Sequence, residues 1–455
     1  MEFKTKCYEH QMEAFNYGMA HDKFILADEQ GLGKTKQSID IAVGRKVFNE
    51  VRKCLIVCGV NSTKYNWEKE IEIHSYESVT MIDGSKAKRI KAIEEWNSNN
   101  AYFGIINIEA LRQDDIILAL RDVGVDMVIV DEIHKCKNPQ SKQGKAIHLL
   151  NAKYRIGLTG TPIQNKILDV YNILKWIGAE NRNFYVFRSR YCKLGPFKNI
   201  IGYQNLPEIH AKINNVMLRR LKRDVLDLPP KIYKTQYVEL STRQKFLYRQ
   251  SKASILEMLN MGINIPDNPL TLLMMLRKIT AGLLTDENPK LDRLIELLED
   301  IEPGKKVIIF SNYKEVTSKI REELEKSFGG VLYIDGDTPI KERQNLVDKF
   351  QTTTNHNIII GTIGAMGTGL TLNKAEYVIF FDKNYNASEN EQAEDRSHRI
   401  GTKNNVNIIS LVAKNSIDER IEALLKEKKK IIDYVVDGEI DSLSGRDVLD
   451  YLLKD

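Results

Sequence analysis

Cysteine is scarce in this chain, and long apolar runs are absent from it. The 455 residues include five cysteines, none of them in a Cys-x-x-Cys pair, so a zinc site of the usual spacing is not expected. Cys54 and Cys58 flank a short apolar run and are expected to be buried thiols. An odd cysteine count without a secretory leader indicates a reducing compartment, either the cytoplasm of a bacterium or phage-infected host or the nucleus of a eukaryote. The lack of any run of about 18 apolar residues excludes a membrane-spanning helix, so no membrane partner is expected.

Positive charge exceeds negative charge only slightly. The net charge of +5 does not by itself indicate a nucleic-acid partner. Two basic clusters stand out, Leu218–Arg223 and Lys426–Lys430, and the simplest interpretation of each is a solvated helix face. The sequence shows neither tandem repeats nor low-complexity tracts, and its length suggests roughly three domains of about 150 residues.

The strongest local pattern is the segment Ala27–Thr35, which reads ADEQGLGKT. It follows a short apolar run and precedes residues that can form a helix, which is the context of a phosphate-binding loop. Gly31 and Gly33 would let backbone amides approach phosphate oxygens. Lys34 would reach the β- and γ-phosphates, and the Thr35 hydroxyl would ligate Mg²⁺. The segment therefore predicts a site for a nucleoside triphosphate.

Two nearby residues bear on this prediction. Asp28 stands where the first glycine of such a loop usually lies, so the segment alone is also compatible with a structural turn. Upstream, Gln11 lies in a segment with helical spacing, and its amide can both donate to and accept from an adenine edge. Without the loop that follows, Gln11 would be interpreted as a surface glutamine.

Apolar β-type runs alternate with helical stretches through the first third of the chain. The runs lie at Cys54–Cys58, Val79–Ile82, Tyr102–Ile106, Met127–Val130 and Tyr154–Leu158. This alternation predicts a parallel sheet covered by helices on both faces, with functional groups at the carboxyl ends of the strands. At one such end, Asp131 is expected to hold Mg²⁺ and Glu132 to orient and deprotonate the attacking water. An acidic pair at a helix cap is the alternative interpretation.

The middle of the chain lacks this alternation of apolar runs and helical stretches, and it is predicted to be mostly helical. The expected helices are Ile167–Ile177, Leu206–Leu221, Ser241–Met261 and Pro269–Ala281. A second strand series predicts a second α/β sheet without a phosphate loop, with strands at Lys306–Ser311, Val331–Ile334, Ile358–Gly361, Tyr377–Phe381 and Val406–Leu411. Beyond the fourth of these runs, Arg396 and Arg399 lie three residues apart and are expected on one face of a helix. Arginines can stabilise charge that develops on a γ-phosphate, although two arginines on a helix are usually surface charge.

Several of these segments resemble the motifs of superfamily-two helicases. Residues 28–35, 131–134 and 158–165 are similar to motifs I, II and III, and the form TGTPIQN resembles the Swi/Snf-type branch. That branch comprises chromatin remodellers, recombination translocases and annealing helicases. Residues 217–231, with MLRRLKRDV and LPPK, carry a further signature of the branch, found where the helical insertion of the first lobe gives way to the linker. The resemblance implies an ATPase that tracks along double-stranded DNA.

Motif VI supplies the rest of the expected catalytic set. Residues 392–399 match its pattern Gln-x-x-x-Arg-x-x-Arg, and the resemblance implies catalytic roles for Gln392, Arg396 and Arg399. Motif V is represented by GTGLTL over residues 367–372. The chain departs from the family pattern at Thr371, where many members have Asn, at residues 385–387, which read Tyr-Asn-Ala for Trp-Asn-Pro, and at Thr402, where Gln is usual.

We therefore expect an α/β protein with two RecA-like P-loop NTPase lobes and helical insertions between them. The expected boundaries are 1–165 for lobe 1, 166–290 for the helical insertions and linker, 291–425 for lobe 2 and 426–455 for a helical brace. The expected cofactors are ATP and Mg²⁺. The expected partner is duplex or branched DNA, which the protein would bind through its phosphates with little sequence preference.

The expected activity is ATP-driven movement on DNA, as in fork remodelling, branch migration or unwinding during repair, recombination or replication. A nucleosome remodeller is less favoured, because no bromodomain-like, chromo-like, zinc or nuclease segment is evident. Three alternatives stay open: an RNA-directed helicase of the same superfamily, the motor subunit of a restriction system, and an ATP-gated DNA-binding protein that does not translocate.

Overall fold

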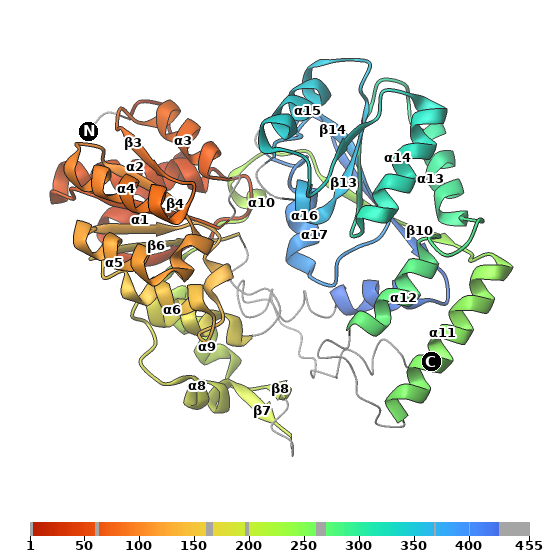
Figure 1. Ribbon diagram of the computed structural model, residues 1–455, viewed down its shortest axis with the longest axis horizontal. Helices are drawn as coiled ribbons and strands as arrows, with labels where there is room; N and C mark the ends of the chain where they lie inside the picture. The colour runs from red at the N-terminus through yellow and green to blue at the C-terminus, as the bar shows by residue number, and fades with distance from the viewer. Residues whose placement is uncertain are drawn as a thin grey trace. The chain divides into compact units, whose positions relative to one another are not determined.

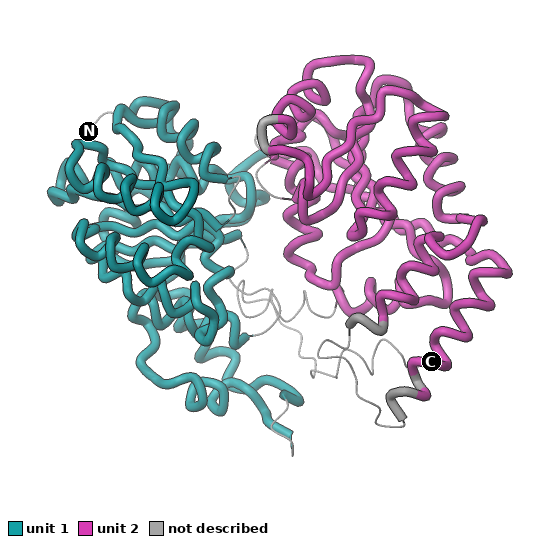
Figure 2. Tube along the Cα trace, viewed as in Figure 1, with its two compact units in different colours: residues 1–227, 431–442 teal, residues 228–430, 443–455 magenta. Residues whose placement is uncertain are grey.

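The chain folds into two compact units that divide between Asp227 and Leu228, as Figure 2 shows. This computed structural model describes residues 3–59, 63–160, 167–195, 200–260, 270–367, 370–399 and 401–426. Several predicted features lie outside these ranges. They are parts of motifs III and V (residues 161–165, 368 and 369), Ile400, the basic cluster from residue 427 onward and the predicted brace after residue 426.

The first unit is built on a seven-stranded sheet in which every pairing is parallel. The order is β3-β4-β2-β5-β6-β1-β9, and the strands are β1 (Lys23–Leu26), β2 (Cys54–Cys58), β3 (Val79–Ile82), β4 (Phe103–Asn107), β5 (Met127–Val130), β6 (Tyr154–Leu158) and β9 (Met217–Leu218). The main helices of this unit are α1 (Glu9–Ala20), α2 (Lys34–Asn49), α3 (Thr63–His74), α4 (Lys86–Ser98), α5 (Asp114–Val123), α6 (Lys142–Leu149), α7 (Tyr171–Trp176), α8 (Phe184–Tyr191) and α9 (Leu206–Asn214) (Figure 1). The five strands that the sequence predicted after the phosphate loop are confirmed to within one residue.

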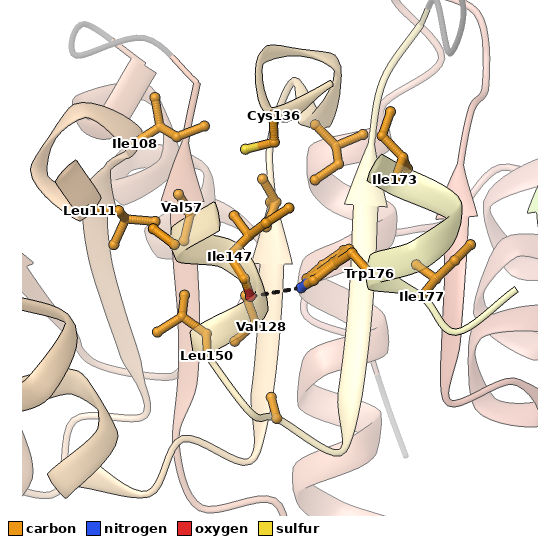
Figure 3. Packing of buried hydrophobic residues seen from close by; sticks show 14 of the residues in the cluster. Val57, Ile108, Leu111, Val128, Cys136, Ile147, Leu150, Ile173, Trp176 and Ile177 are labelled. Carbon is orange, nitrogen blue, oxygen red and sulfur yellow. Dashed lines mark hydrogen bonds between the residues drawn. The ribbon is translucent and has the colours of Figure 1, made fainter. Parts of the chain in front are cut away.

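Side chains alternate between the two faces of the sheet along each strand, so the core of this unit forms two layers. In β2, Leu55 and Val57 face the helices that include α4 to α7, whereas Cys54, Ile56 and Cys58 face those that include α2 and α3. Figure 3 shows the first layer, where Trp176 lies among aliphatic side chains and its Nε1 donates to the Ile147 carbonyl at 3.0 Å. Apolar burial on both faces is what a near-continuous hydrophobic strand requires, and it fixes the strand ends that carry the candidate site.

The predicted helix over Leu206–Leu221 is wrong in its second half. Helix α9 ends at Asn214, and Met217 and Leu218 then pair with Ile25 and Leu26 as the edge strand β9. The backbone continues this pairing past the strand, because Glu29 N donates to Arg220 O at 3.0 Å. Residues 218–221 of the basic cluster are therefore not part of a helix and run beside the phosphate loop, whereas Lys222 and Arg223 begin the short helix α10 (Lys222–Val225).

The second unit contains a parallel sheet of six strands in the order β10-β15-β14-β11-β13-β12. Its strands are β10 (Lys231–Val238), β11 (Lys306–Ser311), β12 (Leu332–Ile334), β13 (Ile358–Thr362), β14 (Ala375–Phe380) and β15 (Val406–Ala413). Helices α13 (Pro289–Glu299) and α14 (Lys314–Phe328) contribute to one core layer, and α15 (Ile340–Thr352), α16 (Ile363–Met366) and α17 (Ala387–Glu394) contribute to the other. Strand β10 was not predicted, whereas the five later strands were.

Two helices of the middle region, α11 (Thr242–Asn260) and α12 (Leu270–Thr280), form a further apolar cluster with residues 417–425. A small antiparallel pair, β7 (Cys192–Leu194) with β8 (Ile200–Tyr203), follows α8 in the first unit. Cys54 and Cys58 are buried free thiols, as predicted. Within the described part of the chain, none of the helices combines the length and the hydrophobicity that crossing a bilayer requires.

Candidate nucleotide site

The predicted phosphate loop lies between β1 and the first turn of α2. Gly31 and Gly33 have φ angles of 88° and 80°, a left-handed conformation that glycine adopts without steric cost. A Cβ atom on Gly33 would lie 2.6 Å from Gln11 Nε2, so a side chain at this position would displace the amide of Gln11. Lys34 is the first residue of α2, which places the loop at a helix N-terminus, where backbone amides favour an anion. These features are the strand, glycine turn and helix that the sequence predicted.

The side chain of Lys34 folds back over the loop. Its Nζ donates to the carbonyl oxygens of Asp28 at 2.7 Å and Glu29 at 3.3 Å. Burial lowers the pKa of Lys34, and the carboxylates of Glu132, Asp28 and Asp131 act in the opposite direction. Lys34 and the acidic pair at the end of β5 thus belong to one electrostatic cluster, as expected for strand ends that share one edge of a parallel sheet.

Asp131 lies at the tip of β5. One of its carboxylate oxygens accepts a hydrogen bond from Trp67 Nε1 at 3.0 Å. Burial raises the pKa of Asp131 to about 6, and the neighbouring Glu132 adds to the effect. A carboxylate held in this way is stabilised by a cation, so the site fits a divalent metal.

The protein offers few metal ligands at this point. No group of three or more His, Cys, Asp or Glu side chains within the described ranges is arranged to hold a metal ion. Mg²⁺ commonly binds through one or two protein ligands together with substrate phosphates. Asp131 and Thr35 suit that arrangement, whereas a site made of protein ligands alone would not fit.

Glu132 has a left-handed backbone, with φ of 50°, which is costly for a residue with a side chain. Its Oε2 is buried and makes no hydrogen bond with the described residues, although it lies 3.2 Å from His134 Nδ1. Gly59 makes room for this conformation, because a Cβ atom there would lie 2.8 Å from Glu132 Cβ. Glu132 is the N-cap residue of the short 3-10 helix Ile133–Cys136, but its side chain makes no capping hydrogen bond. A strained carboxylate at a strand end that does not serve as a cap is typical of a functional group.

His134 joins the acidic pair to the next strand. Its Nδ1 lies 3.2 Å from the hydroxyl of Thr159, which follows β6. Burial, assisted by Lys135 and Lys137, lowers the pKa of His134 to about 3, so the ring is neutral at physiological pH. Beyond Thr159, a Cβ atom on Gly160 would lie 2.6 Å from Gln30 Nε2. The described start of motif III therefore contacts the phosphate loop at Gln30 and contacts His134 of motif II.

Asp28 has a partner that the sequence did not reveal. The side chain is fully buried, and Arg220 Nη2 donates to its Oδ2 at 2.6 Å while Arg220 Nε donates to Oδ1 at 3.1 Å. Arg219 Nη1 donates to the carbonyl oxygens of Ala27 and Gly160, and Lys222 N donates to the carboxylate of Glu29. Three members of the basic cluster thus bind the phosphate loop. The sequence indicated a cationic partner only through Asp28 itself, an acidic residue where a glycine is usual.

Gln11 is buried on α1, next to the loop. Its Oε1 accepts the backbone N–H of Tyr8 at 3.1 Å, as part of a capping box at the start of the helix. The other end of its amide lies against Gly33. A hollow of about 630 Å³ beside α1 is lined in part by Tyr8, His10 and Glu13. Gln11 is therefore close to the loop, as its predicted role at an adenine requires.

The arginines of motif VI do not lie on a helix, contrary to the prediction. Helix α17 ends at Glu394, and residues 395–399 form turns. Arg396 is buried, with Nε donating to Gln392 O at 3.0 Å and Nη1 to Leu370 O at 3.3 Å. After the helix, Ser397 Oγ donates to Glu394 O, and Leu372 N donates to Arg396 O. Gln392 is buried one turn before Arg396.

Arg399 is held by two of the residues that depart from the family pattern. Its Nη1 donates to Thr371 Oγ1 at 2.8 Å, and its backbone N–H donates to Thr402 Oγ1 at 3.1 Å. The Thr402 hydroxyl also lies 2.7 Å from Ser397 O and 2.8 Å from Arg399 O. The two threonines thus shape the turn that presents Arg399.

Comparison with known proteins extends these observations over most of the chain. The family model described as SNF2-related domain matches residues 8–282, and the model described as Helicase conserved C-terminal domain matches residues 289–401. An uncharacterized ATP-dependent helicase of Mycoplasma pneumoniae is 28% identical, over 98% of this chain and 44% of its own length. A putative ATP-dependent helicase/translocase of Bacillus subtilis, YwqA, is also 28% identical, over 91% of this chain and 46% of its own length.

A eukaryotic protein and a solved structure are also similar to this chain. Protein CHROMATIN REMODELING 4 of Arabidopsis thaliana is 28% identical over 92% of this chain and 21% of its own length. Among solved structures, the SWI2/SNF2 ATPase core of Sulfolobus solfataricus in complex with dsDNA covers 96% of this chain and 94% of its own, with 26% identity and a TM-score of 0.45. The chain spans less than half the length of these curated relatives. Because the SNF2-related model matches more than half of the chain and a helicase C-terminal model follows it, the chain belongs to the SNF2 family of ATP-dependent helicases.

Proposed function

We propose that this protein is a DNA-stimulated ATPase that moves along DNA. The observation that carries the proposal is the cluster in the first unit, where Lys34 of the phosphate loop and the half-buried carboxylates of Asp131 and Glu132 interact at one edge of the sheet. A phosphate loop with a metal-holding carboxylate and a base is the set of groups that phosphoryl transfer to water requires.

The proposed roles follow from the contacts of each side chain. Lys34 turns from the loop carbonyls to the β- and γ-phosphates, and Thr35 and Asp131 hold Mg²⁺. Glu132 orients the attacking water and accepts its proton, since its Oε2 is left without a hydrogen bond among the described residues. Bound MgATP supplies the transferable phosphoryl group and the metal charge that neutralises it. Gln11 is proposed to contact the adenine edge.

The second unit is proposed to contribute Gln392, Arg396 and Arg399. Arg396 is largely engaged with carbonyl oxygens of its own unit, which favours a role in shaping the segment. Arg399 is the better candidate to stabilise charge developing on the γ-phosphate, an effect worth about 10³- to 10⁵-fold in related systems. The boundaries predicted at residues 165, 290 and 425 are retained as proposals for the lobes and the insertion.

DNA is the proposed partner on the strength of the family. Membership in the SNF2 family favours DNA over RNA. The basic cluster at 218–223 is not taken as a DNA contact, because Arg219, Arg220 and Lys222 bond to the phosphate loop. Contacts to phosphates would make binding weaken steeply with salt and vary little with sequence. A fork-remodelling or branch-migrating role, with a function in repair or recombination, is the finer form of the proposal.

The test is ATP turnover with duplex, single-stranded, forked and four-way DNA and with duplex RNA, measured side by side. We expect duplex-containing DNA to stimulate turnover and RNA to have little effect. Preference for forked or four-way DNA would support branch remodelling. Equal stimulation by RNA would replace the proposal with an RNA-directed helicase, and DNA binding gated by ATP without turnover would replace it with a clamp. A motor subunit of a restriction system would turn over ATP but need a separate nuclease.

A further inference from the structure

Arg220 makes more contacts around the phosphate loop than any role as a surface charge would require. Its Nε and Nη2 form a two-pronged pair with the carboxylate of Asp28, at 3.1 and 2.6 Å, and its backbone N–H donates to the same carboxylate at 3.1 Å. Nη1 donates to the carbonyl oxygen of His10 and to Glu13 Oε2, both on α1. Nη2 also lies 3.3 Å from Gln37 Oε1 on α2. One guanidinium thus joins the loop to both helices that flank it.

The partners of Arg220 are themselves bonded to the loop. Gln37 Nε2 donates to Asp28 Oδ2 at 3.0 Å and to the Leu32 carbonyl at 3.0 Å. The ring of His10 lies 3.0 Å from the same carbonyl through its Nε2. Asp28 O, on the other side, accepts from Lys34. The position of the loop backbone from Asp28 to Leu32 is therefore fixed by a closed network centred on the Asp28–Arg220 pair.

Burial makes this pair sensitive to the loss of one partner. Asp28 is fully buried, and the Arg220 side chain is 11% exposed. A planar guanidinium matches a carboxylate with two parallel hydrogen bonds, which gives geometric precision that an ammonium cannot reproduce. Removing Arg220 leaves a buried carboxylate without its cation at the first position of the loop.

We propose that Arg220 is a positioning residue for nucleotide binding, which holds Asp28, the loop and helix α1 in the arrangement that receives the phosphates and the base. In this loop the Asp28–Arg220 pair takes the place of the tight turn that a first glycine usually provides. The inference deepens the proposed function by assigning a residue 192 positions from Asp28 in the sequence to the same site. It rests on that function only in taking the loop as the nucleotide site.

The test compares Arg220→Met with a matched control, Arg45→Met. Arg45 is also a buried arginine of the first unit, on α2, and its Nη2 donates to the carbonyl oxygens of Gly18 and His21, with Asp22 at 3.1 Å. It contacts no residue of the phosphate loop in these hydrogen bonds. Loss of either arginine should lower the melting temperature, but only Arg220 should affect the nucleotide.

Two readouts are needed, and neither is catalytic activity. The first is the affinity for MgADP by fluorescence titration. We expect Arg220→Met to bind at least about tenfold more weakly than Arg45→Met, the effect of losing about one charge-assisted hydrogen bond, and Arg220→Lys to be intermediate. The second is hydrogen exchange of the nucleotide-free protein, which should accelerate at residues 27–35 in Arg220→Met and stay unchanged at residues 54–58.

Equal MgADP affinity in Arg220→Met and Arg45→Met, with equal exchange at residues 27–35, would overturn the assignment. If Arg220→Met does not fold, the double variant Asp28→Asn/Arg220→Met removes both charges at similar volume. Wild-type affinity in that variant would overturn the assignment, and a loss of about tenfold would support it. If the wild-type protein itself fails to bind MgADP, the proposed function fails, and the exchange at residues 27–35 still decides whether Arg220 positions the loop.

Discussion

Replacing Lys231 with Met should test how the arginine segment of the second unit is held. Lys231 begins the edge strand β10, and its Nζ lies 2.9 Å from Asp395 Oδ1 and 3.1 Å from Glu394 Oε2. Tyr233 OH donates to Glu394 at 2.9 Å, and His398 Nε2 lies 2.8 Å from Pro229 O. The start of β10 is therefore bonded to the residues that flank Arg396.

The expected magnitude follows from burial. The side chains of Lys231, Glu394 and Asp395 are 15%, 6% and 5% exposed. Burial acts to lower the pKa of Lys231, but the carboxylates of Asp395 and Glu394 prevail and hold it well above the ordinary value. Losing one partner of a buried ion pair costs about 3–5 kcal/mol. For a unit of this size that corresponds to a fall in melting temperature of roughly 6–20 °C.

The control is Lys290→Met, which also removes a buried ammonium of the second unit, paired with Asp418 at 2.9 Å. Both variants should unfold at lower temperature. Only Lys231→Met should also slow DNA-stimulated ATP turnover at unchanged MgADP affinity, and Lys231→Arg should restore much of the rate. Turnover that falls equally in both Met variants would refute the claim that Lys231 acts through the arginine segment.

Three further variants test the proposed roles one at a time. Lys34→Ala should abolish MgATP binding in a fluorescence titration, and wild-type affinity would remove Lys34 from the site. Glu132→Gln should bind MgATP but fail to turn it over, since an amide cannot accept the proton of the attacking water. DNA-stimulated turnover at the wild-type rate would show that the base is another group. Thr402→Val removes the hydroxyl that bonds to the turn of Arg399, so turnover should fall while MgATP affinity holds and Thr402→Ser recovers the rate. An unchanged rate in Thr402→Val would argue against that role.

The features that the sequence predicted correctly are those whose signal is local. The phosphate loop consists of consecutive residues. Strands such as Cys54–Cys58 are continuous apolar runs because both faces of the sheet are buried. The Asp131–Glu132 pair was found because it directly follows such a strand. Placing it near Lys34 required only that parallel strands end at one edge of a sheet.

The features that were missed depend on contacts between distant segments. Edge strand β10 reads Lys-Ile-Tyr-Lys-Thr-Gln-Tyr-Val, and most of its side chains are exposed or half-buried, so it lacks the apolar run that marks a central strand. The two residues of β9 become a strand only by pairing with β1. Asp28 and Arg220 are separated by 192 positions, so no local pattern could join them. The turn at Arg399 depends likewise on Thr371 and Thr402.

The most direct test of the account is the Arg399→Ala variant, measured for MgATP affinity and for turnover with saturating duplex DNA. We propose that hydrolysis needs the phosphate loop of the first unit and Arg399 of the second. MgATP affinity should stay close to that of the wild type, and turnover should fall by about 10³-fold or more. An unchanged kcat in Arg399→Ala would contradict this proposal.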